Sequence, residues 1–212
     1  MTKEPKNRKL RHLPLQAREH FIPYIQFQPK WLLSCGPANG EEYLAIRKHW
    51  PGIRLLGLEP SPVGYAYALK QWPADGILLQ VAVWDRDETV TLHKAHDLMH
   101  GTCFVDFDHI LADDLTGDSG DSIQVPARSL DSLDAEYGPF AEAILWLDVE
   151  GSERRALEGA TWLIARGAIR AVNIEMRPQY ATDFQRLFES WGFVSVRRYF
   201  ECETYWDEVW VR

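Results

Sequence analysis

The stretch Ile144-Leu145-Trp146-Leu147-Asp148-Val149-Glu150-Gly151-Ser152-Glu153 decides the fold class. Its apolar run is typical of a strand buried on both faces, and the acids, glycine and serine that follow are typical of a turn from strand to helix. In open α/β sheets, ligands bind at the carboxyl ends of the strands. We therefore expect this turn to contribute to a binding site.

The polar residues of this turn also have a structural interpretation. Ser152 is expected to cap the next helix, and Glu153 to lie in its first turn, where the positive end of the helix dipole favours an acid. Asp148 and Glu150 precede the cap, so capping does not account for them. We expect at least one of these two carboxylates to contact a ligand.

Size and composition indicate one soluble domain. The chain has 212 residues, and its apolar runs are shorter than the roughly 18 residues needed to span a bilayer. The basic start lacks the apolar segment of a secretion signal. Cys35, Cys103 and Cys202 lie far apart without metal-type spacing, which favours reduced thiols. These features predict a cytoplasmic protein that does not enter the membrane.

Charge is unevenly distributed along the chain. The formal net charge of −8 disfavours general nucleic-acid binding, so no nucleic-acid partner is expected. Residues 1–11 contain five basic residues and one acid, whereas residues 97–121 contain seven Asp and no Lys or Arg. Both segments are typical of solvated chain. The alternatives are attraction of an anionic substrate by the first and cation binding by the second.

The hydrophobic pattern predicts a basic tail and helical N-terminal segment over residues 1–30, followed by one α/β domain over residues 31–212. Gly and Pro positions, caps and β-rich runs place the boundaries of the expected elements. Strands are expected at 31–35, 53–58, 77–84, 89–93, 123–127, 143–149 and 169–176, and helices at 41–50, 62–72, 130–137, 152–165 and 180–191.

Two β-rich runs at the end of the chain must pair as a hairpin. Residues 193–200 and 205–211 are separated by four residues, and parallel strands need a crossover of a dozen or more. A mostly parallel sheet that ends in an antiparallel hairpin differs from the usual dinucleotide-binding order, in which helices join the later strands.

A glycine pair and an acid suggest a nucleoside site. Gly36 and Gly40 follow the first strand, where absent side chains let a cofactor approach the backbone, although a turn that needs positive φ is the alternative. Glu59 ends the second strand, where ribose-binding folds place an acid that accepts from both sugar hydroxyls. The pair is compatible with NAD or S-adenosylmethionine, and the hairpin favours the latter.

From about residue 31 to residue 211, the chain resembles the FkbM-type methyltransferases, a class I S-adenosylmethionine-dependent family. The block Asp-x-Glu-Gly-x-Glu followed by Leu-x-Gly-Ala is the specific part of this resemblance. It implies a Rossmann-like, mostly parallel seven-stranded sheet with helices on both faces, and methyl transfer, usually to an oxygen of a sugar or small metabolite. The motifs are Leu58-Glu59-Pro60, Val81-Ala82-Val83, Ser129-Leu130-Asp131-Ser132-Leu133, Leu147-Asp148-Val149-Glu150-Gly151-Ser152-Glu153, Leu157-Glu158-Gly159-Ala160 and Ile174-Glu175.

The resemblance implies that S-adenosylmethionine contacts the ends of several strands, at Ser34, Gly36, Pro37, Asn39, Gly40, Glu59, Pro60, Ser61, Ala82 and Asp148. The first loop departs from the family. The family loop reads close to Asp-x-Gly-Ala-Asn-x-Gly, whereas here Ser34 replaces the acid and the asparagine is shifted by one position. A serine can hydrogen-bond to the cofactor's ammonium end but supplies no charge. Weaker cofactor affinity or an altered loop path is the expected consequence.

Methyl transfer to an alcohol requires alignment of the reactants and loss of the alcohol proton. Asp148 or Glu150 is expected to take that proton or to hold a divalent cation that lowers the acceptor pKa, and we favour Asp148. The alternative for Asp148 is a hydrogen bond to backbone amides or to the methionine part of the cofactor. Glu175, at the end of the next strand, is a further candidate for a cation site.

Three histidines lie close together in the sequence. His93, His96 and His100 have spacings that would align on a helix, and His96 is the candidate catalytic histidine, although surface positions are the alternative.

The expected acceptor is a sugar or another small molecule, and no oligomeric state is predicted. The rival functions are an NAD(P)-dependent oxidoreductase and a non-catalytic module that keeps the fold.

Overall fold

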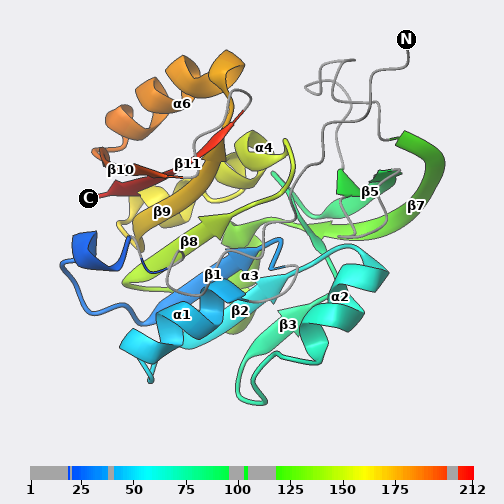
Figure 1. Ribbon diagram of the computed structural model, residues 1–212, viewed down its shortest axis with the longest axis horizontal. Helices are drawn as coiled ribbons and strands as arrows, with labels where there is room; N and C mark the ends of the chain where they lie inside the picture. The colour runs from blue at the N-terminus through cyan, green and yellow to red at the C-terminus, as the bar shows by residue number, and fades with distance from the viewer. Residues whose placement is uncertain (1–18, 20, 38–40, 96–102, 105–117, 200–204) are drawn as a thin grey trace, which may run out of the picture.

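The computed structural model describes residues 19, 21–37, 41–95, 103–104, 118–199 and 205–212. Its main element is a sheet of seven strands in the order β10-β11-β9-β8-β1-β2-β3 (Figure 1). Neighbouring strands from β9 to β3 are parallel, and β11 is antiparallel to both β9 and β10. The predicted parallel sheet with a terminal hairpin is therefore confirmed. The strands are β1 (Trp31–Cys35), β2 (Arg54–Leu58), β3 (Ile77–Leu79), β8 (Ala143–Leu147), β9 (Ile169–Met176), β10 (Val194–Tyr199) and β11 (Trp206–Val211).

Helices cover both faces of this sheet, which explains why every residue of β1 and β8 is buried. Alternate side chains of a strand point to opposite faces, so Leu32 and Leu33 lie in different core clusters. One face packs against η2 (Ile22–Tyr24) and α1 (Glu41–His49), and the other against α3 (Leu130–Tyr137), α4 (Glu153–Glu158), α5 (Thr161–Ala165) and α6 (Pro178–Ser190). Figure 1 shows α2 (Pro62–Leu69) beside β3, at the end of the sheet opposite the hairpin.

A second, smaller sheet lies between β3 and β8 in the sequence. It contains β4 (Ala82–Val83), β5 (Glu88–Ala95), β6 (Cys103–Phe104) and β7 (Asp118–Arg128) in the order β4-β7-β5-β6. The strand predicted over 77–84 therefore divides, because β3 pairs with β2 whereas β4 leaves the main sheet and pairs with β7. The short strands predicted at 89–93 and 123–127 are confirmed as parts of β5 and β7.

The helix predicted over 152–165 is interrupted at Gly159. A Cβ at this position would lie 2.0 Å from the Trp84 carbonyl oxygen, so the close approach of the two segments requires glycine. The side chain of Asp131 accepts from the backbone N–H groups of Trp162 and Leu163, at 3.0 Å each, and caps α5. The motif Leu-x-Gly-Ala and Asp131 thus form a structural joint between α3, α4 and α5.

The described part of the N-terminal segment packs on the main sheet. Phe21 is buried, and its ring lies 5.3 Å from the Trp146 ring in an edge contact. Over residues 21–30 the predicted helix is limited to η2, and residues 10–18 and 20 lie outside the described part of the chain. In the described ranges, no helix is both long and apolar enough to cross a membrane.

Candidate functional site

A glycine turn joins the ends of three strands. Gly36, directly after β1, donates its N–H to the Leu58 carbonyl oxygen of β2 at 2.9 Å, and Asp148 donates its N–H to the Cys35 carbonyl oxygen at 3.1 Å. Gly36 has φ of +78°, and a Cβ there would lie 2.0 Å from the Asp148 carbonyl oxygen. The positive φ and the close approach to Asp148 therefore both require glycine at this position. This agrees with the alternative interpretation of Gly36 as a turn residue that needs positive φ.

Glu59 lies at the same edge, directly after β2. Its side chain is buried, and Oε1 accepts from the Ser61 N–H at 2.9 Å. Ser61 caps α2, because its Oγ accepts from the Gly64 N–H at 3.3 Å. A Cβ on Gly64 would lie 2.7 Å from Cδ of Glu59, so this glycine leaves the room that the carboxylate occupies. The helix start thus fixes the Glu59 carboxylate.

Gly36, Glu59 and Asp148 consequently share one edge of the sheet, as the sequence predicts. Pro37 is buried next to Gly36, and Pro60 is half-buried next to Glu59. Ala82 is placed differently, since it lies in the core of the small sheet. The structure leaves three candidate residues outside its described ranges, namely Asn39, Gly40 and His96.

Ser34 does not present a free hydroxyl at this edge. Its Oγ donates to Oε1 of Glu42 at 2.8 Å, and both side chains are buried. Glu42 belongs to the first turn of α1. Glu42 is not identifiable from the sequence, because an acid in the first turn of a helix is common and its contact with β1 depends on which way α1 faces.

The turn after β8 has an unusual backbone. Glu150 has φ of +53° and Gly151 of +101°. A non-glycine residue in this region costs about 1–3 kcal/mol, and such strain clusters at functional sites. The carboxylate of Glu153 stabilises the turn by accepting from the N–H groups of Val149 at 3.3 Å and Gly151 at 3.2 Å.

Ser152 takes the predicted N-cap position of α4, but the contact expected of its side chain is not made. Its side chain makes no capping hydrogen bond, and its buried Oγ has no hydrogen-bond partner among the described residues. The neighbouring Glu153 carboxylate accepts from the N–H groups of Val149 and Gly151, which lie in the turn before α4.

Carboxylates crowd the end of the turn around one arginine. Nη2 of Arg177 lies 3.5 Å from Oε2 of Glu150 and 3.4 Å from Oε1 of Glu175. Burial raises the pKa of Glu175 to about 10, and the negative charges of Asp148 and Glu150 add to this rise. Burial also raises the pKa of Glu153. Glu175 therefore keeps its proton at neutral pH and can donate a hydrogen bond.

The expected cation site is not formed by these carboxylates. Within the described part of the chain, no three His, Cys, Asp or Glu side chains are arranged so that they could hold a metal ion. Glu175 lies close to the turn that follows β8. Arg177 contacts both Glu175 and Glu150 of this turn, and the acids of the turn add to the rise in the pKa of Glu175 that burial causes.

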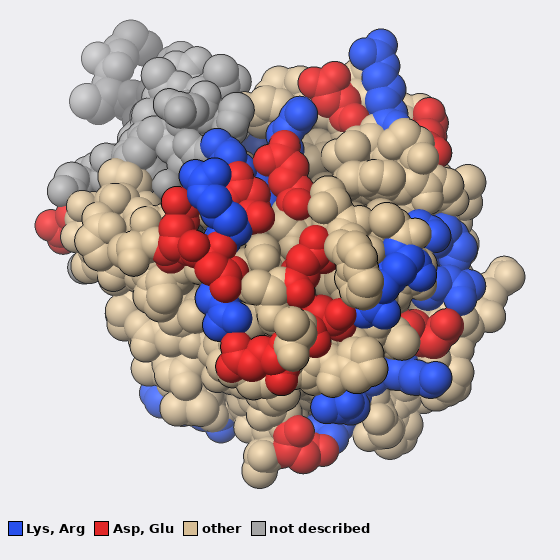
Figure 2. All heavy atoms as spheres, turned by 180° about the vertical axis from the view of Figure 1, so that it is seen from behind, with Lys and Arg blue, Asp and Glu red and all other residues tan. Residues whose placement is uncertain are grey.

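Charges are mixed on the face seen from behind. Figure 2 shows acidic side chains near the middle of this face, with basic side chains among and around them. Many arginines form ion pairs: Arg128 contacts Asp87 at 2.8 Å and Glu136 at 2.9 Å, and Arg155 contacts Asp85 at 2.6 Å. Such paired arginines are less available to phosphate groups.

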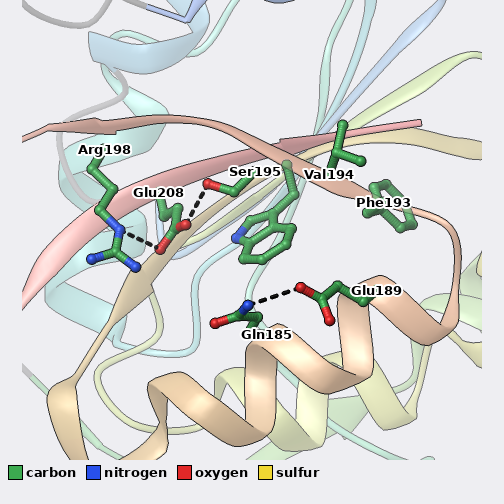
Figure 3. A pocket seen from close by; sticks show the side chains of 8 residues that line it. Gln185, Glu189, Phe193, Val194, Ser195, Arg198 and Glu208 are labelled. Atoms are coloured by element: carbon green, nitrogen blue, oxygen red, sulfur yellow. Dashed lines mark hydrogen bonds and ion pairs between the residues drawn. The ribbon is translucent and has the colours of Figure 1, made fainter.

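A cavity of about 330 Å³ lies away from this edge, between α6 and the terminal hairpin (Figure 3). On β11, Glu208 and Trp210 line the cavity and pair with Ile174 and Val172 of β9. Glu175 directly follows Ile174, so its side chain points to the opposite face of the sheet. The cavity and Glu175 therefore lie on different faces of the sheet. Its lining residues are Gln185, Glu189, Phe193, Val194, Ser195, Arg198, Glu208 and Trp210.

Several solved structures similar to this chain are methyltransferases, and the fold is that of the class I methyltransferases, which is Rossmann-like. Methyltransferase FkbM from Methylobacillus flagellatus KT is 14% identical with a TM-score of 0.59, covering 87% of this chain and 44% of that one. Precorrin-6y C5,15-methyltransferase from Geobacter metallireducens GS-15 is 9% identical with a TM-score of 0.51, covering 93% and 87%. A putative RNA methyltransferase from Pyrococcus horikoshii is 9% identical with a TM-score of 0.50, covering 93% and 81%.

A sequence profile of the methyltransferase FkbM domain matches residues 34–204. The chain belongs to this family, which confirms the resemblance inferred from its motifs. It spans less than half the length of the Methylobacillus flagellatus protein. The search of curated proteins found no match. Because the similar structures are named for different methyl acceptors, the fold alone does not define the acceptor.

Proposed function

We propose that this domain transfers a methyl group from S-adenosylmethionine to a hydroxyl group of a sugar or another small metabolite. The observation that carries the proposal is the common edge of Gly36, Glu59 and Asp148, held together by hydrogen bonds between the ends of β1, β2 and β8. Membership of the FkbM family supports methyl transfer as the reaction class.

The residues at this edge fit the proposed methyl donor. The Glu59 carboxylate is fixed beside the start of α2, where it can accept from two ribose hydroxyls. Gly36 lets the end of β1 approach the backbone of Asp148 closely, which places Asp148 beside this turn. When bound, the donor supplies a methyl group on a positively charged sulfur, which is a good leaving group.

We assign the removal of the acceptor proton to Asp148. Four carboxyl groups lie near the end of β8, and three of them are less suited to this step. Glu153 is buried and accepts from the N–H groups of Val149 and Gly151. Glu150 is in contact with the cationic Arg177, and Glu175 is protonated at neutral pH because its pKa is raised to about 10. Glu175 can instead donate a hydrogen bond to the acceptor.

The charge distribution supports a small acceptor. The chain has a net charge of −8, and the carboxylates of Asp148 and Glu150 lie near the place of the acceptor, which disfavours a phosphate backbone as the acceptor.

The test combines ligand identification with transfer. Mass spectrometry of the purified protein, followed by a labelled-methyl screen over sugars, phenols and small acids, is expected to give S-adenosylmethionine or its demethylated product and at least one methylated hydroxyl. Asp148→Asn should lower transfer about 100-fold or more while cofactor binding is retained. Asp183→Asn, on the exposed side of α6, is the matched control.

Other outcomes would contradict the proposal. Binding of a nicotinamide cofactor without S-adenosylmethionine would indicate an oxidoreductase. Binding of S-adenosylmethionine without transfer to any acceptor in the screen would indicate a non-catalytic module. Full transfer by Asp148→Asn would remove Asp148 from the mechanism.

A further inference from the structure

A buried carboxylate lies behind the glycine turn. Glu42, in the first turn of α1, is 2% exposed, and the Ser34 side chain that contacts it is fully buried. The contact joins Oγ of Ser34 and Oε1 of Glu42 at 2.8 Å. A carboxylate is costly to bury, so its retention at a ligand-binding edge suggests that it has a role beyond joining α1 to β1.

The hydrogen bond also determines which of the two groups is the donor. A serine hydroxyl can donate one hydrogen bond, and Ser34 donates this bond to Glu42. Ser34 therefore cannot donate to a ligand while this bond is made. Burial raises the pKa of the Tyr43 hydroxyl, and the neighbouring Glu42 carboxylate adds to this rise.

The position of the pair is central to the edge. Ser34 is paired with Gly57 of β2 and with Trp146 of β8, so it lies between the strands that end at Glu59 and Asp148. A cofactor with its ribose at Glu59 and its methyl group near Asp148 passes over the end of β1. In a low-dielectric interior a charge acts over several ångströms with little screening.

We propose that Glu42 supplies the negative charge that attracts the ammonium group of the cofactor's methionine part, and that Ser34 orients this carboxylate. Glu42 is thus a positioning residue that acts through space. Because the ammonium group belongs to the proposed cofactor, this assignment rests on the proposed function. The structural alternative is that the pair only fastens α1 to β1.

Glu42→Gln separates these two roles, because glutamine keeps the shape of glutamate and can still accept from Ser34. Calorimetry would measure the affinity for S-adenosylhomocysteine and for 5′-methylthioadenosine, which has the same nucleoside and a sulfur but no ammonium group. We expect about tenfold weaker binding of S-adenosylhomocysteine and unchanged binding of 5′-methylthioadenosine. Glu136→Gln, at an exposed position, is the control.

A second variant tests the charge itself. In the double variant Ser34→Asp/Glu42→Gln the carboxylate moves to β1, and binding of S-adenosylhomocysteine should recover relative to Glu42→Gln alone. Unchanged binding by Glu42→Gln, equal weakening of both ligands, loss of folding or no recovery in the double variant would each overturn the proposal. If the wild-type protein binds neither ligand, the proposed function itself fails.

Discussion

Two buried carboxylates on adjacent strands have different surroundings. Glu208 of β11, beside the cavity of Figure 3, accepts from the Ser195 hydroxyl and from the Trp206 indole at 2.8 Å, and it lies 3.2 Å from Nε of Arg198. Donors on two strands therefore surround this carboxylate. Glu175 of β9 has a different environment, with other acids close by.

The acids at the carboxyl edge share a single arginine. Arg177 contacts both Glu150 and Glu175, while burial raises the pKa of Glu175 and the charges of Asp148 and Glu150 add to this rise. In the hairpin, donors from the fold satisfy one carboxylate. At the edge, the fold brings carboxylates together at a cost in folding stability. Groups with perturbed pKa values cluster at functional sites. We infer that the hairpin region serves stability and the edge serves chemistry.

The largest effect on stability is expected in the hairpin. Glu208→Gln removes the charge that faces Arg198 and one acceptor site, so the free energy of unfolding should fall by about 2 kcal/mol. Urea denaturation measures this change. Calorimetry with S-adenosylhomocysteine should give an unchanged affinity, and a large loss of affinity would mean that the two regions are not separate.

Gly64→Ala should weaken cofactor binding without loss of stability, which is the reverse of the effect expected for Glu208→Gln. The new Cβ would lie 2.7 Å from Cδ of Glu59, and the carboxylate, as the end of a flexible side chain, would move away. We expect about tenfold weaker binding of S-adenosylhomocysteine, equivalent to about 1.4 kcal/mol, without loss of unfolding free energy, because alanine favours the helix. Gly52→Ala is the control, since a Cβ there has nothing within 4 Å. Equal affinities for the two variants would contradict the role of Glu59.

Glu175→Gln tests how much folding stability is lost by burying Glu175 beside other carboxylates. The folded protein retains the Glu175 proton up to a pKa of about 10, whereas the unfolded chain releases it near the ordinary value of 4.5. Over this range the folded state binds more protons, so this carboxyl lowers stability as pH rises. Glutamine removes the effect. We expect the variant to gain about 1 kcal/mol or more relative to wild type between pH 5 and pH 8.

Urea denaturation at the two pH values is the measurement for Glu175→Gln, with the exposed Glu158→Gln as control. A variant that loses stability relative to wild type as pH rises would show that Glu175 is ionised in the folded protein. The contrast with Glu208 would then disappear.

Much of the fold could be predicted because its signals are local. The buried strands, the residues that end them and the short link inside the hairpin are all readable along the chain. The division of the strand over 77–84 and the interruption at Gly159 were missed. Both depend on contacts between distant segments, namely the pairing of β4 with β7 and the approach of Gly159 to Trp84.

The candidate site was predictable only in outline. Gly36, Glu59 and Asp148 follow strands, and parallel strands place their carboxyl ends together. Glu42 and Arg177 were missed as site residues because their side-chain partners lie on other elements of the fold. Ser152 was assigned as a cap from its residue type, whereas the neighbouring Glu153 makes the contacts with the turn.

The central claim is that the carboxyl edge binds a nucleoside cofactor through Glu59. Calorimetric titration of S-adenosylhomocysteine into the wild-type protein, Glu59→Ala and the exposed control Glu189→Ala tests it most directly. Loss of two hydrogen bonds to a charged group predicts affinity about 100-fold weaker for Glu59→Ala and unchanged for the control. Equal affinity of wild type and Glu59→Ala would contradict the account.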